Sequence, residues 1–252
     1  MPGERMPLRL LGIRDELTTR PWRPPARHWP GSPLIGGIDE QAGGTWLAVH
    51  PGIPRAACLL NGQGTLADPA NRRSRGDLPL RAAATGRALL EDLAADRDAL
   101  RGYDPFHLIC ATPAVVTALT WSGVDGAPPV ARDLAPGTHL FTNAGHAYPA
   151  EPGDPDGEPK AAHFADKFAS ARPSADPALP VAEAWGDWLT LAAGDGLDPA
   201  DPAAILVRHE MPGGRLHGTT SVTLVGLADD AVRYDFQPHP GDAGTWFPVA
   251  IR

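Results

Sequence analysis

Three short apolar runs follow one another between residues 34 and 61, with turn residues between them. The runs cover residues 34–38, 45–49 and 55–61. Gly43-Gly44 and Pro51-Gly52 occupy the two connections. Short runs at this regular spacing are typical of antiparallel strands joined by tight turns. The stretch therefore predicts a β-meander, and any fold for this chain must contain an antiparallel sheet.

Strands and helices alternate in blocks along the rest of the chain. Apolar residues recur every three to four positions over residues 79–100, which predicts a long helix. Shorter helices are predicted at residues 160–171, 181–193 and 202–207. Further strands are predicted at residues 6–13, 106–111, 115–121, 139–143, 221–227, 231–236 and 245–251, and an acidic loop at 151–158. Because no break in composition separates these blocks, we expect one α+β domain over residues 1–252, with antiparallel sheets and outer helices.

The charge and hydropathy of the chain exclude several classes of protein. A net charge of −8 opposes nonspecific binding to nucleic acid. No stretch approaches 18 consecutive apolar residues, so no membrane span is predicted. The first residues do not form a signal peptide, which favours a cytoplasmic protein. No pattern specifies an oligomeric state.

Cysteine and histidine show no metal-binding spacing. Cys58 and Cys110 each lie inside an apolar run, so we expect buried core thiols. His209-Glu210 begins like a zinc-protease motif, but Gly occupies position 213, where the second His should stand. No metal site is predicted. Of the nine His, His28 stands in the most unusual setting, beside Trp29 in a Pro-rich arm.

A charged triplet closes the first predicted strand. The apolar run 7–13 is followed directly by Arg14-Asp15-Glu16. Three charged side chains at a strand end form either a binding site or a solvated terminus, and the triplet alone does not separate the two interpretations.

Several segments together resemble one protein family. Ile13-Arg-Asp-Glu16 resembles the Asn-Arg-Asp-Glu signature of the NRDE proteins, also called the transport and Golgi organisation 2 family. Other segments of that family are similar to residues 37–47, 73–78, 103–108, 141–143 and 218–221. The segments occur in the family's order and span nearly the whole chain. Ile13 replaces the Asn of the signature, which removes one polar contact with a ligand.

The resemblance implies a fold similar to the N-terminal-nucleophile hydrolases, a four-layer αββα sandwich of two antiparallel sheets with outer helices. In catalytic relatives of that fold, an N-terminal Cys, Ser or Thr attacks an amide carbonyl and its own α-amino group is the base. Here residue 2 is Pro, and neither Cys58 nor Cys110 is N-terminal. Either the assigned start of the gene lies too far downstream, so that a first strand with its Cys is missing, or the protein lacks the nucleophile and binds ligands. The turn at Pro2-Gly3, directly before the first predicted strand, favours the missing strand.

The resemblance also implies roles for residues at the rim of the family's cleft. Arg14 would orient the nucleophile or a ligand carboxylate, Asp15 would hold a terminal amine or Arg14, and Glu16 would lie beside them. Asn61 and Asn143 would donate to an oxyanion, or would only cap turns.

Aromatic and basic residues complete the set of candidates. Trp46 either packs in the core or stacks on a ligand. Arg73 and Arg75 would meet carboxylates or phosphates, or would only solvate a loop, and His28 is a further candidate for ligand binding.

The family suggests a ligand-binding and trafficking protein for haem or an acyl-lipid ligand. It would need no cofactor, and haem would be its ligand. The alternative is a cysteine amidohydrolase whose nucleophile lies on an omitted N-terminal strand. In either case we expect residues 1–252 to have no hydrolase activity.

Overall fold

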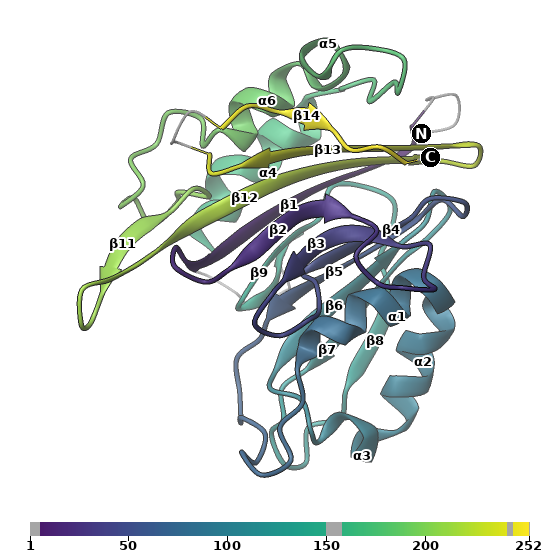
Figure 1. Ribbon diagram of the computed structural model, residues 1–252, viewed down its shortest axis with the longest axis vertical. Coiled ribbons are helices and arrows are strands. Elements are labelled where there is room, and N and C mark those ends of the chain that lie inside the picture. The colour runs from purple at the N-terminus through teal and green to yellow at the C-terminus, as the bar shows by residue number, and fades with distance from the viewer. Residues whose placement is uncertain (1–5, 150–157, 241–243, 252) are drawn as a thin grey trace. The chain divides into compact units, whose positions relative to one another are not determined.

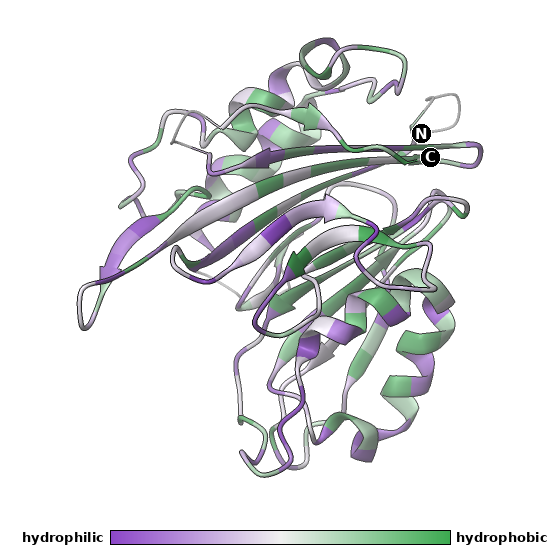
Figure 2. Cartoon of the chain, viewed as in Figure 1, coloured by the Kyte–Doolittle hydropathy of each residue, from purple (hydrophilic) through white to green (hydrophobic). Residues whose placement is uncertain are grey.

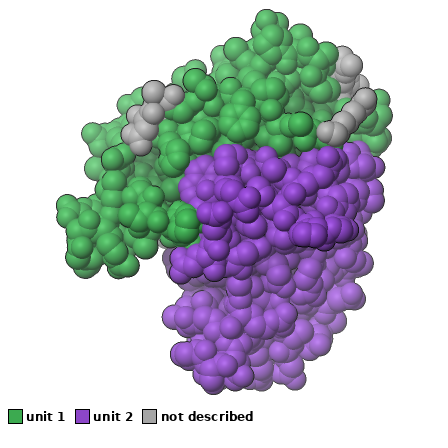
Figure 3. Space-filling model, viewed as in Figure 1, with its two compact units in different colours: residues 1–21, 137–140, 146–252 green, residues 22–136, 141–145 purple. Residues whose placement is uncertain are grey.

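The computed structural model describes residues 6–149, 158–240 and 244–251. The chain divides into two compact units (Figure 3). Each unit is built on its own sheet. Unit 1 comprises residues 1–21, 137–140 and 146–252, and unit 2 comprises residues 22–136 and 141–145. The predicted α+β class with antiparallel sheets is confirmed.

Unit 1 contains a five-stranded antiparallel sheet. Its order is β1 (Leu8–Leu17), β12 (Arg215–Ala228), β13 (Ala231–Pro238) and β14 (Phe247–Pro248), and β11 (Arg208–Met211) also pairs with β12. The long β12 is the centre of this sheet (Figure 1). The charged segment of β1 is therefore held by pairing with β12.

Three short helices provide the apolar core of unit 1. They are α4 (Pro159–Ser170), α5 (Val181–Trp185) and α6 (Asp187–Ala192). Trp188 stacks on Trp185 with ring centroids 5.8 Å apart and meets the edge of Phe168 at 5.1 Å. These rings pack with Leu224 of β12, so the aromatic side chains fix the helices on one face of the sheet.

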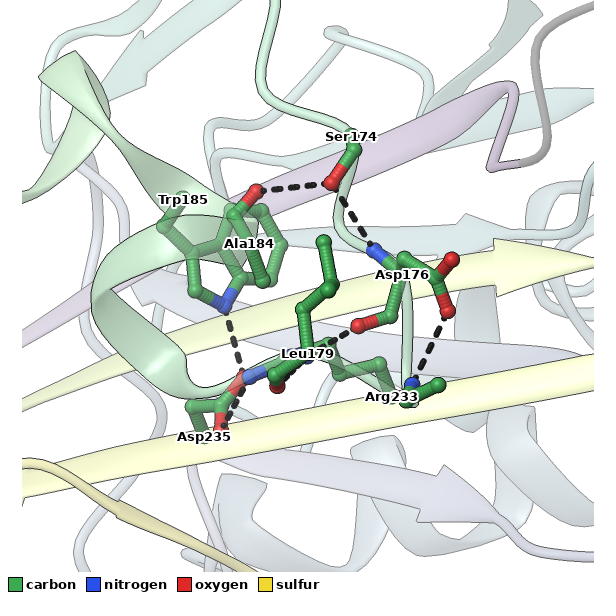
Figure 4. A network of polar contacts seen from close by, with 8 residues as sticks. Ser174, Asp176, Leu179, Ala184, Trp185, Arg233 and Asp235 are labelled. Carbon is green, nitrogen blue, oxygen red and sulfur yellow. Dashed lines mark hydrogen bonds and ion pairs between the residues drawn. The ribbon is translucent and has the colours of Figure 1, made fainter.

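A buried ion pair ties the segment before α5 to β13 (Figure 4). Arg233 Nε donates to Asp235 Oδ2 at 2.5 Å, and the Trp185 indole donates to the same oxygen at 2.6 Å. The Arg233 guanidinium also donates to the carbonyls of Asp176 and Leu179. Because both charges are paired and further hydrogen-bonded, their burial is tolerated.

Unit 2 is a seven-stranded antiparallel meander with its strands in chain order. The strands are β2 (Trp22–Ala26), β3 (Ile35–Asp39), β4 (Leu47–His50), β5 (Arg55–Asn61), β6 (Phe106–Ala111), β7 (Val116–Trp121) and β8 (Val130–Asp133). The predicted meander over residues 34–61 is confirmed, and it continues at both ends. A separate hairpin is formed by β9 (Leu140–Thr142) and β10 (Gly145–Tyr148).

Helices cover one face of the meander. They are the 3₁₀ turn η1 (Arg75–Asp77), α1 (Leu78–Thr85), α2 (Arg87–Ala95) and α3 (Arg97–Leu100). Hydrophobic and hydrophilic stretches alternate along α1 and α2 (Figure 2). The apolar side of these helices, which includes Leu78 and Leu90, packs on Tyr103 and on strand residues that include Phe106, Leu108 and Trp121.

Two predicted helices are interrupted at glycine. The helix predicted at 79–100 divides at Gly86, whose φ is +84°, and again at Asp96, which caps α3. The helix predicted at 181–193 divides at Gly186, whose φ is +47°. Glycine adopts a positive φ readily, so the backbone leaves the helical conformation at Gly86 and Gly186. The spacing of apolar residues continues across both breaks, which is why the sequence predicted unbroken helices.

The remaining differences between the predicted and the observed elements arise from hydrogen bonds of polar side chains and from strand pairing. Residues 202–207 do not form a helix, because Asp198 and Asp201 accept bonds from backbone amides two residues on. The first strand does not stop at residue 13 but continues to Leu17. Strands β2, β8, β10 and β11 were not predicted, and the strand predicted at 245–251 is reduced to β14. Most of the acidic loop predicted at 151–158 lies outside the described residues.

Within the described part of the chain, no helix has the length and apolar character that a membrane crossing needs.

Replacing Asp235 with Ala should destabilise unit 1 strongly. The change leaves the guanidinium of Arg233, which is 5% exposed, without its carboxylate. Removing one partner of a buried pair costs about 3–5 kcal/mol of unfolding free energy, measured by urea denaturation. Asp230→Ala, at the exposed β12–β13 turn, is the control and should change stability by less than about 0.5 kcal/mol. Equal effects in the two variants would contradict the role of the pair.

Candidate functional site

A β-bulge holds the charged triplet in unit 1. Arg14 is registered with Ser221 and Asp15 with Thr219, so Thr220 is the extra residue of β12. The Thr220 hydroxyl accepts from Arg14 Nη1 at 2.8 Å and donates to the Arg14 carbonyl at 3.1 Å. The Thr220 hydroxyl therefore holds both the backbone carbonyl and the guanidinium of the buried Arg14.

The three charged residues do not share one face of the sheet. Successive strand residues point to opposite faces, so Arg14 and Glu16 lie on one face and Asp15 on the other. Asp15 accepts a hydrogen bond from the Thr219 hydroxyl at 2.7 Å. Glu16 forms an ion pair with Arg20 at 3.6 Å. The triplet is thus divided between two environments, which the sequence spacing did not show.

Ser221 is a candidate that sequence reasoning missed. It is 1% exposed and lies beside Arg14, and its hydroxyl has no hydrogen-bond partner among the described residues. A buried hydroxyl without a partner is uncommon and points to a polar contact that a ligand or water completes. The only signal in the sequence was its place at the end of the segment 218–221.

In unit 2, two of the family-like segments meet at a pair of glycines. A Cβ on Gly44 would lie 2.5 Å from the carbonyl carbon of Gly76, a distance that real Cβ atoms do not adopt. The Thr45 amide donates to the Gly76 carbonyl at 2.9 Å. Glycine at both positions therefore allows residues 43–46 and 73–76 to pack backbone against backbone.

Arg75 connects the second of these segments to a third. Its Nη1 donates to the Pro105 carbonyl at 2.5 Å. Burial lowers the pKa of Arg75 from its ordinary value, although nearby Asp104 opposes that effect. The carbonyl of Pro105 also accepts a hydrogen bond from the amide of Gly62. Arg75 therefore stabilises the place where the loops that contain Gly62 and Pro105 meet.

Arg73 lies on the aromatic ring of Tyr103. Its guanidinium carbon is 4.7 Å from the ring centroid, and its amide donates to the Gly102 carbonyl at 2.7 Å. The Tyr103 hydroxyl donates to Asp77 at 2.9 Å. Burial, and then the charge of Asp77, raise the pKa of Tyr103 from its ordinary value. The stacked ring limits the conformations of the Arg73 side chain.

Arg73 lines a cavity of about 530 Å³ in unit 2. Its walls include Leu66, Arg73, Arg97, Arg101, Tyr103 and Trp121. Arg97 lies over the Trp121 ring at 5.8 Å and pairs with Asp125 at 3.3 Å, and Arg101 pairs with Asp98 at 2.6 Å. The wall thus carries three arginines and three aspartates, Asp68, Asp98 and Asp125, so its formal charges balance. The Tyr103 and Trp121 side chains in it are only 1% and 2% exposed, whereas Leu66 is largely exposed.

The other predicted residues of unit 2 lie outside this cavity. Asn61 ends β5, and Asn143 lies in the β9–β10 turn; both are exposed. His28 Nε2 is 2.8 Å from the Pro24 carbonyl, and its ring meets the edge of Trp29. Among the predicted residues of this unit, the structure therefore places only Arg73 in the cavity wall.

Trp46 has the contacts of a packing residue. Its ring meets the edge of Trp22 at 6.0 Å, and it covers Gly37 so closely that a Cβ there would lie 2.3 Å from the indole. The absence of a side chain at Gly37 makes room for the indole of Trp46.

His107 is a buried titratable group beside the Asn143 turn. Its Nδ1 lies 2.9 Å from the Thr120 hydroxyl. Burial lowers the pKa of His107, and the nearby backbone of Asn143 opposes this only in part. No hydrogen bond of ordinary geometry reaches Nε2 from the described residues. A neutral imidazole held in this way is a structural element of the sheet rather than an exposed base.

The family is decided by comparison with known families. The family model described as Transport and Golgi organisation 2 matches residues 2–176. The chain belongs to the transport and Golgi organisation 2 family. The match covers all of unit 2 and the β1 strand of unit 1, so it includes every predicted site residue. No curated protein sequence matches the chain significantly.

Neither thiol of this family member has the character of a nucleophile. Both cysteines are free. Cys58 keeps some exposed area, but so many atoms surround it that burial raises the pKa of its thiol to about 12. Burial raises the pKa of Cys110 to about 11. Because the thiolate is the reactive form, both side chains are inert at neutral pH.

Alkylation should detect this inertness. At pH 8 the folded protein should react with iodoacetamide far more slowly than the same protein in guanidinium chloride, because both thiols stay protonated well above that pH. Mass spectrometry counts the modified sites over time. Rapid modification of Cys58 or Cys110 in the folded protein would contradict the raised pKa values.

The glycine contact is tested by Gly44→Ala. The added methyl group would overlap the backbone of Gly76, and we expect a loss of about 1–3 kcal/mol in unfolding free energy. Gly52→Ala is the matched control, because its Cβ would meet nothing closer than 3.7 Å. Denaturant unfolding of both variants measures the difference. Similar stability in the two would show that the segments can separate without cost.

Proposed function

We propose that this family member is a cytoplasmic protein that binds and carries a small apolar ligand with acidic groups, such as haem or an acyl compound. The cavity of unit 2 is the single observation on which the proposal rests. Its volume of about 530 Å³ lies within the range of about 300–1,000 Å³ that is typical of small-molecule sites. The two unpaired thiols agree with a reducing compartment.

Arg73 is the residue that would recognise the acidic group. A guanidinium offers planar, bidentate hydrogen bonding to a carboxylate or phosphate. Its contact with Tyr103 and its backbone bond to Gly102 hold it in place before a ligand arrives, so little side-chain entropy would be lost on binding. Arg97 and Arg101 already pair with Asp125 and Asp98, so the acidic group is assigned to Arg73.

Leu66 would receive the apolar part of the ligand. Leu66 is 63% exposed, which is unusual for a large apolar side chain in a cavity wall. Fully burying a leucine side chain contributes about 1.5–3 kcal/mol. A ligand that covered Leu66 while its acidic group met Arg73 would use both properties of the cavity.

Arg75 and His28 have other roles within this proposal. Arg75 is engaged by the Pro105 carbonyl and does not line the cavity. His28 is paired with the Pro24 carbonyl. We propose that both support the fold of unit 2, and that Arg73 alone of the three contacts the ligand.

An amidohydrolase activity stays a prediction from the resemblance, as does the likeness to the N-terminal-nucleophile fold. What supports that fold is that each unit has one antiparallel sheet with helices on one face. The chemistry would need an N-terminal nucleophile, and the inert Cys58 and Cys110 cannot replace it.

The binding proposal is tested by titrating the purified chain with haem, followed at the Soret band, and with a fatty acid, followed by calorimetry. Arg73→Gln should weaken binding of the acidic ligand by about tenfold or more, because a charge-assisted hydrogen bond contributes about 1.5–3 kcal/mol. Arg23→Gln is the matched control, since it removes an exposed arginine that pairs with Glu40 outside the cavity.

The two variants distinguish recognition of the ligand by Arg73 from a general effect of the protein's net charge. Equal weakening by Arg73→Gln and Arg23→Gln would mean that only net charge matters, and the proposal for the cavity would fail. Thermal unfolding of Arg73→Gln, measured alongside, shows whether loss of the contact with Tyr103 has unfolded unit 2 instead.

A further inference from the structure

Two histidines that are eight residues apart in the sequence face each other on the β11–β12 hairpin. His209 and His217 are directly registered partners. Their ring centroids are 5.0 Å apart, and the ring planes are tilted by 34°. Directly opposed residues of an antiparallel pair lie on the same face of the sheet, so both imidazoles project to one side.

Nitrogen atoms of this pair are available for a further contact. His209 is exposed, and its imidazole contacts the His217 ring without a side-chain hydrogen bond to any described residue. His217 Nδ1 is buried and also has no partner there. By contrast, His139 Nδ1 and His146 Nε2 lie 2.9 Å apart and already satisfy each other.

The ring spacing suits a shared metal ion. A metal–imidazole bond of about 2.0–2.1 Å places the ion roughly 3.2 Å from each ring centroid. Two imidazoles on one ion at an angle of about 90–110° then have centroids roughly 4.5–5.2 Å apart, given the same bond length. The observed 5.0 Å lies within that interval.

We propose that His209 and His217 form a binding site for a divalent transition-metal ion, with Cu²⁺ preferred. Among the described residues no group of three or more His, Cys, Asp or Glu is arranged around a metal position. The site therefore has two imidazole ligands, and water completes the coordination. Imidazole suits copper, nickel and zinc, and copper binds tightest of the divalent first-row ions.

The surrounding charges nearly balance. Arg215 lies two residues before His217 and on the same face of the sheet. Asp15 is the registered partner of Thr219, two residues after His217, and also lies on that face. Arg208 and Glu210 alternate with His209 and project from the other face. No net charge attracts the ion, so the two imidazole lone pairs provide the affinity.

The test is a titration of the untagged, full chain with Cu²⁺ at neutral pH. We expect one ion per chain by calorimetry, and an electron paramagnetic resonance spectrum with coupling to two imidazole nitrogens. His209→Gln and His217→Gln should each weaken binding by about tenfold or more, because a two-ligand site becomes a one-ligand site. Each spectrum should then show one coupled imidazole.

Two variants provide controls. His139→Gln alters the other histidine pair, and Glu210→Gln alters a neighbour on the opposite face, so both should keep the native affinity. His209→Gln carries the test if His217→Gln is unstable, because His209 is exposed. Failure of the native chain to bind, unchanged affinity in His209→Gln, or an equal loss in His139→Gln would overturn the proposal.

Discussion

The close approach of Gly44 and Gly76 is the contact on which the candidate site of unit 2 depends. It allows two loops to pack backbone against backbone and places the second loop where Arg75 reaches Pro105 and Arg73 reaches Tyr103. Any side chain at Gly44 would separate the loops. The segments that carry the family resemblance thus hold one another together, and the cavity wall is a consequence of that packing.

Unit 1 shows the same dependence of charged side chains on backbone pairing. The bulge at Thr220 gives Arg14 a partner at each end, whereas the alternation of the strand directs Asp15 to the other face. A charged triplet in a sequence is therefore not one binding group. The sheet divides its members, and each acquires the neighbour that its own face supplies.

The local elements could largely be predicted from sequence, and the contacts between distant segments could not. The meander over residues 34–61 followed from turn residues and short apolar runs. The division of the long helix at Gly86 did not, because apolar spacing continues across a residue with positive φ. Arg73 was a candidate from the start, but its place in a cavity wall depends on Tyr103, and the pairing of His209 with His217 depends on register. Periodicity contains no information about either.

Amide chemical shifts of the ¹⁵N-labelled chain, recorded during titration with a fatty acid, test the central claim most directly. Binding in the cavity of unit 2 predicts that the largest changes occur in residues 65–73, 97–103 and 121–125, which surround it. Changes centred on Arg14 and Ser221 in unit 1, with those three segments unaffected, would contradict the account.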